Sequence, residues 1–450
     1  MRFPSIRLVA VALAAGVALF ALPARAQGTP PEVVARAIHE RVITLDTHVD
    51  ISPANFTADR NYTQRLTNQV NLPKMVDGGL DAVFLIVYVG QSQDFTPEGY
   101  RAAYNQAIEK FEAVHRLTGQ IAPDRIGLAL TPADVQRIAA SGRKVALIGI
   151  ENAYPLGDDL KNIQAFYDRG GRYLSLAHNG HSQWSDSNTG EANQEWKWNG
   201  LSPLGRQAIA EMNRVGMMID ISHPSKASSM QTFQLSRAPV IASHSAVKAL
   251  CGHSRNMDDE QLMALKQNGG VMQTVAFASY VKCDPAPAER QPALQKLYAD
   301  FGLPAPGARG GGRGARGAGG GARAGGGGGR GGRGALQAAI DSLPAGRRAE
   351  FNQRLGEIDR MYPAPARATV ADFVNHIDYA VKLIGIDHVG ISSDFDGGGG
   401  VEGWSDATET FNVTLELVKR GYTEAEIAKL WSGNLLRVMG EVQRIAGTLK

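Results

Sequence analysis

Strand-like and helix-like segments alternate along most of this chain, and this alternation limits the possible folds more than any other feature. Eight apolar runs have the length and composition of buried strands, and they span residues 43–51, 80–90, 145–152, 173–178, 216–223, 239–245, 269–277 and 387–394. Amphipathic patterns predict helices between most of them, at 100–117, 158–169, 203–215, 258–267 and 369–384. Buried strands that alternate with helices form parallel sheets, and eight such units predict an α/β fold of the closed (β/α)8, or TIM-type barrel, class.

An open, doubly wound sheet is the alternative. A sheet of that kind typically carries a Gly-rich phosphate-binding turn after its first strand, and no such turn follows residues 43–51. A closed barrel uses about 250 residues as one domain, and often more when it carries insertions. We therefore expect residues 27–450 to form a single barrel domain.

Residues 1–26 have the pattern of a secretory signal peptide. Arg2 and Arg7 precede the apolar run 8–22, and a small-residue cleavage site ends at Ala26. A transmembrane anchor is the alternative, but fifteen apolar residues are few for a helix that crosses a bilayer. We expect cleavage near Ala26 and a periplasmic or secreted protein. No other segment has the length and hydropathy of a stable membrane anchor.

One segment differs sharply from the rest in composition. Residues 307–334 consist of 17 Gly, 6 Arg and 5 Ala. Such a segment buries too little apolar surface to offset the entropy lost on ordering, so it predicts a disordered, cationic loop. Its flanks predict short helices, and together they form a low-complexity insertion over about residues 285–365, before the last strand.

Charge limits the partners of the chain. Arg/Gly segments occur in RNA-binding proteins, but the formal net charge of the whole chain is only +3. Three positive charges, Arg2, Arg7 and Arg25, belong to the predicted signal peptide, so the mature chain is close to neutral. We expect no nucleic-acid partner, because nucleic-acid-binding domains carry a strongly basic face.

Chemically active side chains gather at the carboxyl ends of the predicted strands. They are His48, Asp50, Glu151, His178, His223, His244 and Asp394. In a barrel these ends open at one mouth, where active sites form. The three imidazoles of His48, His223 and His244 with the carboxylates of Asp50 and Glu151 suffice for two divalent cations, with one carboxylate bridging them.

Two metal ions a few ångströms apart indicate hydrolysis, because they lower the pKa of a bridging water and polarise a carbonyl or phosphoryl oxygen. Asp394 then has three possible roles, as the proton shuttle, as a third metal carboxylate or as a cap on the turn DFDGGGG that it begins. We expect Asp394 to lie across the barrel, opposite the polar residues of the first strand.

The two cysteines, Cys251 and Cys283, form either a disulfide or two buried thiols, and their number alone leaves both open.

Seven motifs in order resemble the renal (membrane) dipeptidase family of the amidohydrolase superfamily. They are LDTHVD, GIENAYPLG, YLSLAHN, IDISHPS, PVIASHSAVKALCGHSRNMDDEQL, HVGISSDFDG and GNLLRV. The resemblance runs from about residue 35 to 445, except for about 285–365. It implies a (β/α)8 barrel with two zinc ions.

The resemblance assigns the metal ligands residue by residue. His48 and Asp50 match the ligands of one zinc, His223 and His244 match those of the other, and Glu151 matches the bridging carboxylate.

The remaining matches concern the substrate and the disulfide. His178 matches a histidine that contacts the substrate and stabilises the tetrahedral intermediate. Arg255 matches an arginine that holds the substrate carboxylate, and Asp394 matches the catalytic aspartate. Cys251 and Cys283 match a disulfide-bonded pair. The Gly/Arg tract departs from the pattern of the family and puts substrate access in doubt.

The sequence thus predicts an exported dinuclear zinc dipeptidase that attacks the peptide bond with a metal-bridging hydroxide. The resemblance extends the substrates to dipeptides with a C-terminal D-residue, and a homodimer is compatible with it. Hydrolysis of N-acyl amino acids or β-lactams is the alternative with the same metals. A solute-binding or surface-interaction protein that works through the Gly/Arg segment is an alternative of another class, and it leaves the metal cluster without a role.

Overall fold

A computed structural model of the chain describes residues 29–92, 94–304 and 330–449. The predicted signal peptide lies outside these residues, so its cleavage stays a prediction. Most of the Gly/Arg tract also lies outside them. None of the helices in the described ranges is both long and apolar enough to cross a membrane.

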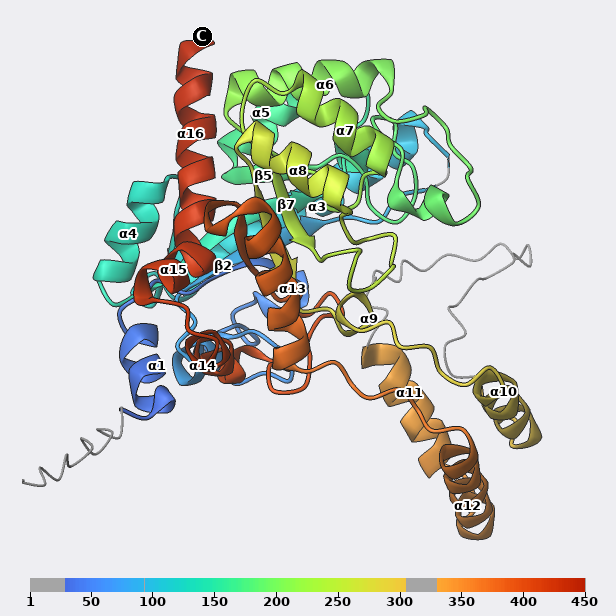
Figure 1. The fold of residues 1–450 in the computed structure, drawn as a ribbon. Coiled ribbons are helices and arrows are strands. Elements are labelled where there is room, and N and C mark those ends of the chain that lie inside the picture. The colour runs from blue at the N-terminus through green and yellow to red at the C-terminus, as the bar shows by residue number, and fades with distance from the viewer. Residues whose placement is uncertain (1–28, 93, 305–329, 450) are drawn as a thin grey trace, which may run out of the picture.

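A parallel sheet forms a nearly closed barrel at the centre of the molecule (Figure 1). Its strands run in the order β1-β2-β4-β5-β6-β7-β8-β9, and a further strand, β3, pairs with β4 beside this path. Their bounds are β1 (Leu45–Asp50), β2 (Ala82–Tyr88), β3 (Ile126–Leu128), β4 (Lys144–Glu151), β5 (Gly171–Ser175), β6 (Met218–Asp220), β7 (Ile241–Ser245), β8 (Val271–Val275) and β9 (Val389–Ser392). The predicted (β/α)8 barrel is confirmed, and β3 is the described strand that the sequence did not predict, because three residues carry too little periodic pattern.

The first and last strands of the barrel are neighbours. A parallel bridge joins Val49 to Phe395, and the backbone N–H of Asp50 donates to the carbonyl of Phe395 at 2.9 Å. Asp394 therefore lies beside His48 and Asp50, and the expectation that it lies opposite them was wrong. The reason is closure, since a sheet that closes on itself brings its two edge strands together.

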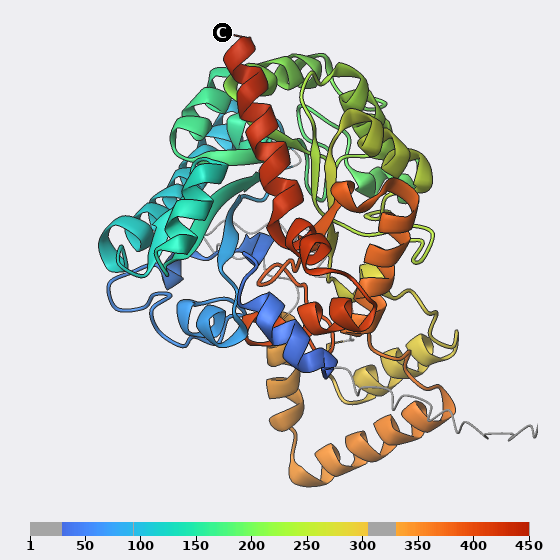
Figure 2. The ribbon, with the colours of Figure 1, turned by 60° about the vertical axis from the view of Figure 1, so that its left-hand side comes forward.

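Helices surround the sheet in the regular β/α order (Figures 1 and 2). Those of the barrel are α1 (Pro31–His39), α2 (Leu72–Gly78), α3 (Pro97–Arg116), α4 (Pro132–Ala140), α5 (Lys161–Asp168), α6 (Pro203–Val215), α7 (Lys226–Leu235), α8 (Asp259–Asn268), α9 (Ala278–Val281), α13 (Val370–Ile384), α14 (Phe411–Lys419), α15 (Glu424–Ala428) and α16 (Asn434–Thr448). Capping boxes fix the start of several of them, including Thr131 with Asp134 and Thr369 with Asp372. All five predicted helices are present.

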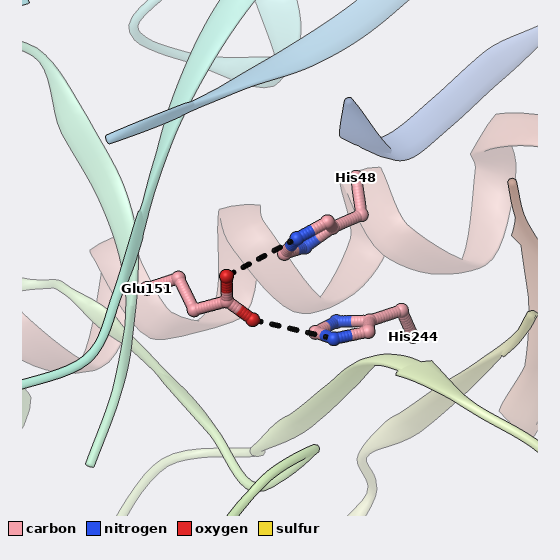
Figure 3. Close-up of side chains that lie close together, drawn as sticks. All are labelled: His48, Glu151 and His244. Atoms are coloured by element: carbon pink, nitrogen blue, oxygen red, sulfur yellow. Dashed lines mark ion pairs between the residues drawn. The ribbon is translucent and has the colours of Figure 1, made fainter. Parts of the chain in front are cut away.

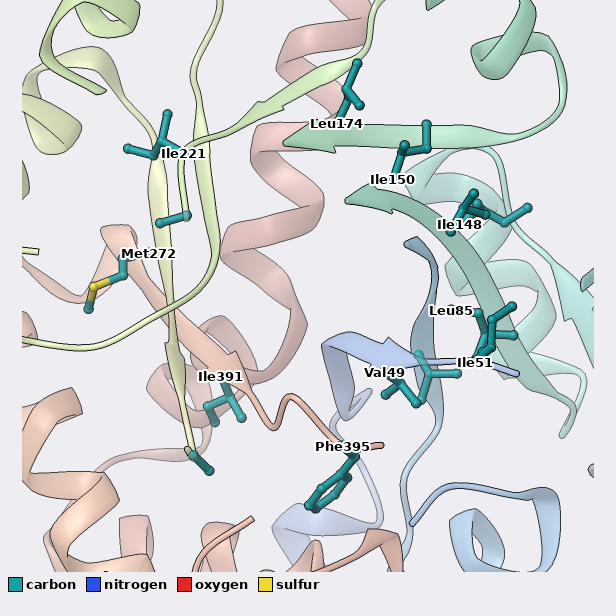
Figure 4. Packing of buried hydrophobic residues seen from close by; sticks show 14 of the residues in the cluster. Val49, Ile51, Leu85, Ile148, Ile150, Leu174, Ile221, Met272, Ile391 and Phe395 are labelled. Carbon is teal, nitrogen blue, oxygen red and sulfur yellow. The ribbon is translucent and has the colours of Figure 1, made fainter. Parts of the chain in front are cut away.

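Alternating side chains along the strands build two apolar layers. In β4, Leu147 belongs to the layer inside the barrel, whereas Ile148 and Ile150 pack outward against the helices. Figure 4 shows the outward layer, which continues from Leu85 to Phe395. Glu151 shares the face of Leu147, so the strand directs its carboxylate into the barrel mouth.

The predicted insertion leaves the barrel after β8. Helices α10 (Arg290–Asp300), α11 (Arg330–Asp341) and α12 (Ala345–Met361) project away from it (Figure 1). Phe351 packs edge-on against Tyr298 and Phe301 in a small apolar cluster separate from the barrel core. The predicted helical flanks are confirmed, and the last residues of the Gly/Arg tract, from Arg330, belong to α11.

Candidate active site and metal centre

The side chains predicted at the strand ends meet at the barrel mouth. Three overlapping groups each hold their ligand atoms within 4.8 Å of one another: His48, Glu151 and His244; Glu151, His178 and His223; and His48, Asp50 and Asp394. Side chains from six different strand ends therefore converge on one place, although they are spread over almost 350 residues of sequence.

Glu151 lies at the centre of this cluster, and its two oxygens face different partners (Figure 3). Oε1 lies 2.9 Å from His223 Nε2 and 3.4 Å from His244 Nε2. Oε2 lies 3.7 Å from His48 Nε2. Ligands on a tetrahedral ion with bonds of about 2.0–2.1 Å are about 3.3 Å apart. The spacing of these atoms therefore fits ligands of metal ions, with one carboxylate shared between two groups.

The ring of His244 is oriented by a hydrogen-bond chain. Ser243 Oγ donates to Asp220 Oδ2 at 2.7 Å and lies 2.8 Å from His244 Nδ1. Because Ser243 donates its single hydroxyl hydrogen to Asp220, its oxygen accepts a hydrogen bond from the N–H at His244 Nδ1. The lone pair of His244 is then on Nε2, the atom that faces Glu151. This is the tautomer that a metal ligand requires.

His48 is oriented in the same way by Tyr173. The hydroxyl of Tyr173 donates to the carbonyl of Thr47 at 3.0 Å and lies 3.0 Å from His48 Nδ1. Tyr173 therefore accepts a hydrogen bond from Nδ1, and Nε2 is the ring nitrogen that faces Glu151. For His223, Nδ1 has no hydrogen-bond partner among the described residues.

The cations of the protein offset the burial of two carboxyl groups of the site only in part. Burial, followed by repulsion from Glu151, raises the pKa of Asp50 to about 6. Burial also raises the pKa of Asp394 well above its usual range. At both acids burial thus outweighs the attraction of His48, and a divalent ion would favour the ionised carboxylates.

The pKa values of the histidines shift in different directions, depending on the charged groups around each ring. Burial alone would lower the pKa of His48, but the carboxylates of Glu151, Asp394 and Asp50 outweigh it and raise this pKa to about 9. Burial, assisted by neighbouring cations, holds the pKa of His223 and of His244 well below the usual range. These two rings are therefore neutral, which is the form that binds metals.

The turn after β9 places Asp394 against Asp50. Asp394 and Asp396 adopt the left-handed backbone region, with φ of 57° and 64°. A Cβ atom added to Gly397 would lie 2.2 Å from Asp394 Oδ1 and 2.3 Å from Asp50 Oδ2. Only glycine leaves room for both carboxylates here.

Arg255, in the loop after β7, is buried with most of its donors unused. Its Nη2 donates to the carbonyl of His244 at 3.0 Å, but Nε and Nη1 have no partner among the described residues. A buried guanidinium with two free donors can bind a carboxylate of a ligand.

Cys251 and Cys283 form the predicted disulfide, with Cα atoms 5.2 Å apart, and Asn256 donates to the carbonyls of Cys251 and Tyr280. These contacts fix the loop that carries Arg255.

Sequence reasoning missed several residues that hold the site. Asp46 accepts from the backbone and hydroxyl of Ser393 and so joins β1 to the turn of Asp394. Asp220 and Tyr173 act through the histidines, as described above. An acid two or three residues before a strand-end histidine, as in Asp46 before His48 and Asp220 before His223, is the signal that could have marked both acids. Lys110, in the middle of α3, lies close enough to interact with Asp50 and Glu151, but no sequence pattern marks it as a residue near the site.

A family model of membrane dipeptidases (peptidase family M19) matches residues 33–450. The chain belongs to this family. It is a metal-dependent dipeptidase, and the resemblance inferred from its motifs is confirmed.

Individual relatives agree with this assignment. The dipeptidase aclJ of Aspergillus oryzae is 29% identical over 99% of this chain and 89% of its own length. The probable dipeptidase PvdM from Pseudomonas aeruginosa is 33% identical, and its crystal structure superposes with a TM-score of 0.72 over 92% of this chain and 99% of that one. A metallo peptidase from Rhodobacter sphaeroides, liganded with a phosphinate mimic of L-Ala-D-Ala, has a TM-score of 0.62 over 89% of this chain and 99% of that one. It is 20% identical, so this likeness shows the fold alone.

Substitution of Gly397 by alanine tests the contact between the two carboxylates. We expect Gly397→Ala to lose most of its bound metal and its dipeptidase activity, because the new methyl group displaces Asp50 and Asp394 together. Metal analysis and turnover on one preparation measure both. Gly119→Ala is the matched control, since a Cβ at Gly119 contacts nothing. Full metal content in Gly397→Ala would contradict the close packing of the turn.

Proposed function

We propose that this enzyme is an exported dinuclear zinc dipeptidase. The observation that carries the proposal is the position of Glu151, whose two oxygens face two separate groups of imidazoles. His48 and Asp50 would hold one zinc, His223 and His244 the other, and Glu151 would bridge them. Bound zinc would lower the pKa of a water molecule and polarise the peptide carbonyl.

The protein's own residues would position the dipeptide. The two unpaired donors of Arg255 suit the C-terminal carboxylate of the substrate in a bidentate pair. The ring of His178 packs between the tilted rings of Tyr88 and His223, with centroids 4.4 Å and 4.3 Å away. Burial lowers the pKa of His178, so its ring is neutral and can donate an N–H to the oxyanion that develops at the carbonyl.

Asp394 would move the proton. Burial raises the pKa of its carboxyl, which makes its carboxylate a stronger base than an exposed aspartate. It is placed to take a proton from the attacking water and to deliver it to the leaving amine. Its position beside His48 and Asp50 also supports the rival role of a metal ligand, so a variant has to separate the two.

Three finer parts of the proposal, namely export, the acceptance of a D-residue and the homodimer, rest on the sequence and on the family. Export follows from the signal-peptide pattern of residues 1–26. Acceptance of a C-terminal D-residue follows from the family, as does the homodimer.

Substrate panels test the reaction. We expect the purified enzyme to contain about two divalent ions per chain, to release amino acids from dipeptides, and to lose this activity on chelation. N-acyl amino acids and β-lactams are the comparison panels, because the same metals would serve both. Turnover of either panel above that of every dipeptide would favour the alternative amidohydrolase reaction.

Amidated substrates test the role of Arg255. Wild-type enzyme should cleave dipeptides about tenfold or more better than their C-terminal amides, because a charge-assisted pair contributes about 1.5–3 kcal/mol. Arg255→Ala should lower activity on the free acid and so reduce the ratio of the rate on the dipeptide to the rate on its amide. Arg255→Lys should restore part of this ratio. Equal kcat/KM values for acid and amide in the wild type would exclude a carboxylate clamp.

Asp394→Asn separates the proton shuttle from the metal ligand. A shuttle variant keeps its zinc and still binds dipeptide, but its kcat falls by about 10²–10⁴, which is typical of a lost general acid–base group. A ligand variant instead loses metal and recovers activity when zinc is added in excess. Metal content beside turnover decides between them, and rescue by zinc would exclude the shuttle.

A further inference from the structure

Lys110 is a cation in the wall of the active site to which no role has been given. It lies in α3, and its Nζ is 5.6 Å from the centre of the Tyr88 ring. The Tyr88 ring in turn contacts the ring of His178, with centroids 4.4 Å apart, and His178 Nε2 lies 3.9 Å from Glu151 Oε2. Two side chains therefore separate this ammonium from the centre of the cluster.

The ammonium of Lys110 has no direct counter-charge. It forms no ion pair or hydrogen bond with another described residue, and the nearest acids that influence it are Asp50 and Glu151. Both acids are proposed metal ligands, so bound metal would take up their charge. An incompletely buried lysine without a partner at a substrate site is then available to a ligand anion.

The strand order places Lys110 across the barrel from Arg255. Tyr88, under the ammonium, ends β2, the second strand of the closed order, whereas Arg255 follows β7, the sixth. In an eight-stranded barrel the second and sixth strands face each other. A dipeptide with its C-terminal carboxylate on Arg255 therefore directs its N-terminal residue toward Lys110.

We propose that Lys110 selects dipeptides whose N-terminal residue has a carboxylate side chain, that is, aspartyl and glutamyl dipeptides. This inference rests on the proposed function, because it uses the proposed orientation of the substrate. A side-chain carboxylate reaches further than the α-amino group and can pair with Nζ at the edge of the site. The pair forms in a partly dehydrated pocket, where a charge–charge contact is stronger than on the surface.

The closing experiment compares Glu-Ala with Gln-Ala, which differ in one charge at nearly equal shape. The ratio of their kcat/KM values should be about tenfold in the wild type, which corresponds to about 1.4 kcal/mol. In Lys110→Gln this ratio should fall to near one, and in Lys110→Arg it should persist. The affinities for the phosphinate analogues of both dipeptides should follow the same pattern, which gives a readout that needs no turnover.

Arg101→Gln is the matched control, because it removes one positive charge from the same helix at an exposed side chain that pairs with Glu98. It should leave the Glu-Ala to Gln-Ala ratio unchanged. Zinc content is measured on every variant. A loss of zinc in Lys110→Gln together with an equal fall for both dipeptides would show that Lys110 only balances the metal ligands, and would overturn the proposal.

The two proposals fail in different ways. If the wild type cleaves Gln-Ala as well as Glu-Ala, Lys110 selects nothing, although the dipeptidase assignment stands. If the wild type cleaves no dipeptide, the proposed function fails, and equal affinities for the two phosphinates then exclude the acidic subsite as well.

Discussion

The site depends on one buried carboxylate that several imidazoles share. Without the histidines, Glu151 would be an uncompensated charge in the interior, which costs several kcal/mol. With them, its pKa stays well below the usual range despite burial, because His178, His48 and His223 stabilise the ionised form. At Asp50 and Asp394 burial outweighs the attraction of His48, so the pKa of both carboxyl groups stays raised. The cluster is therefore balanced within the protein only in part, and metal ions complete the balance.

Closure of the barrel makes this arrangement possible. The N–H of Asp50 donates to the carbonyl of Phe395, and Asp46 holds Ser393, so the first and last strands are joined at the level of the site. These contacts bring residues more than 340 positions apart into one cluster. A sheet that stayed open would leave Asp394 at a free edge, away from the ligands of β1. The chemistry thus depends on a long-range pairing that no local segment specifies.

The sequence predicted most of the barrel and most of the cluster, and the reason is periodicity. Apolar strand runs such as 145–152 have polar residues at their carboxyl ends, and the rule that parallel strands open at one mouth then brings Glu151 together with His223 and His244. Sequence-based prediction failed for the features that depend on how distant segments meet in the folded chain. The three-residue β3 carries no period, and the neighbour relation of Asp394 and Asp50 follows from closure rather than from spacing. Asp220 acts through Ser243 on His244, a contact that sequence order alone does not reveal.

Lys110 illustrates a further limit of strand-end reasoning. Residues at strand ends reach the mouth directly, so their type and position are enough to predict them. A helix residue reaches the same mouth only if its side chain is long and the intervening wall is thin, as it is at Tyr88. Lysine satisfies the first condition because its flexible stem carries the charge far from the backbone. Metal ligation can therefore be predicted from strand ends, whereas the residues that discriminate between substrates can come from the helices and loops around them.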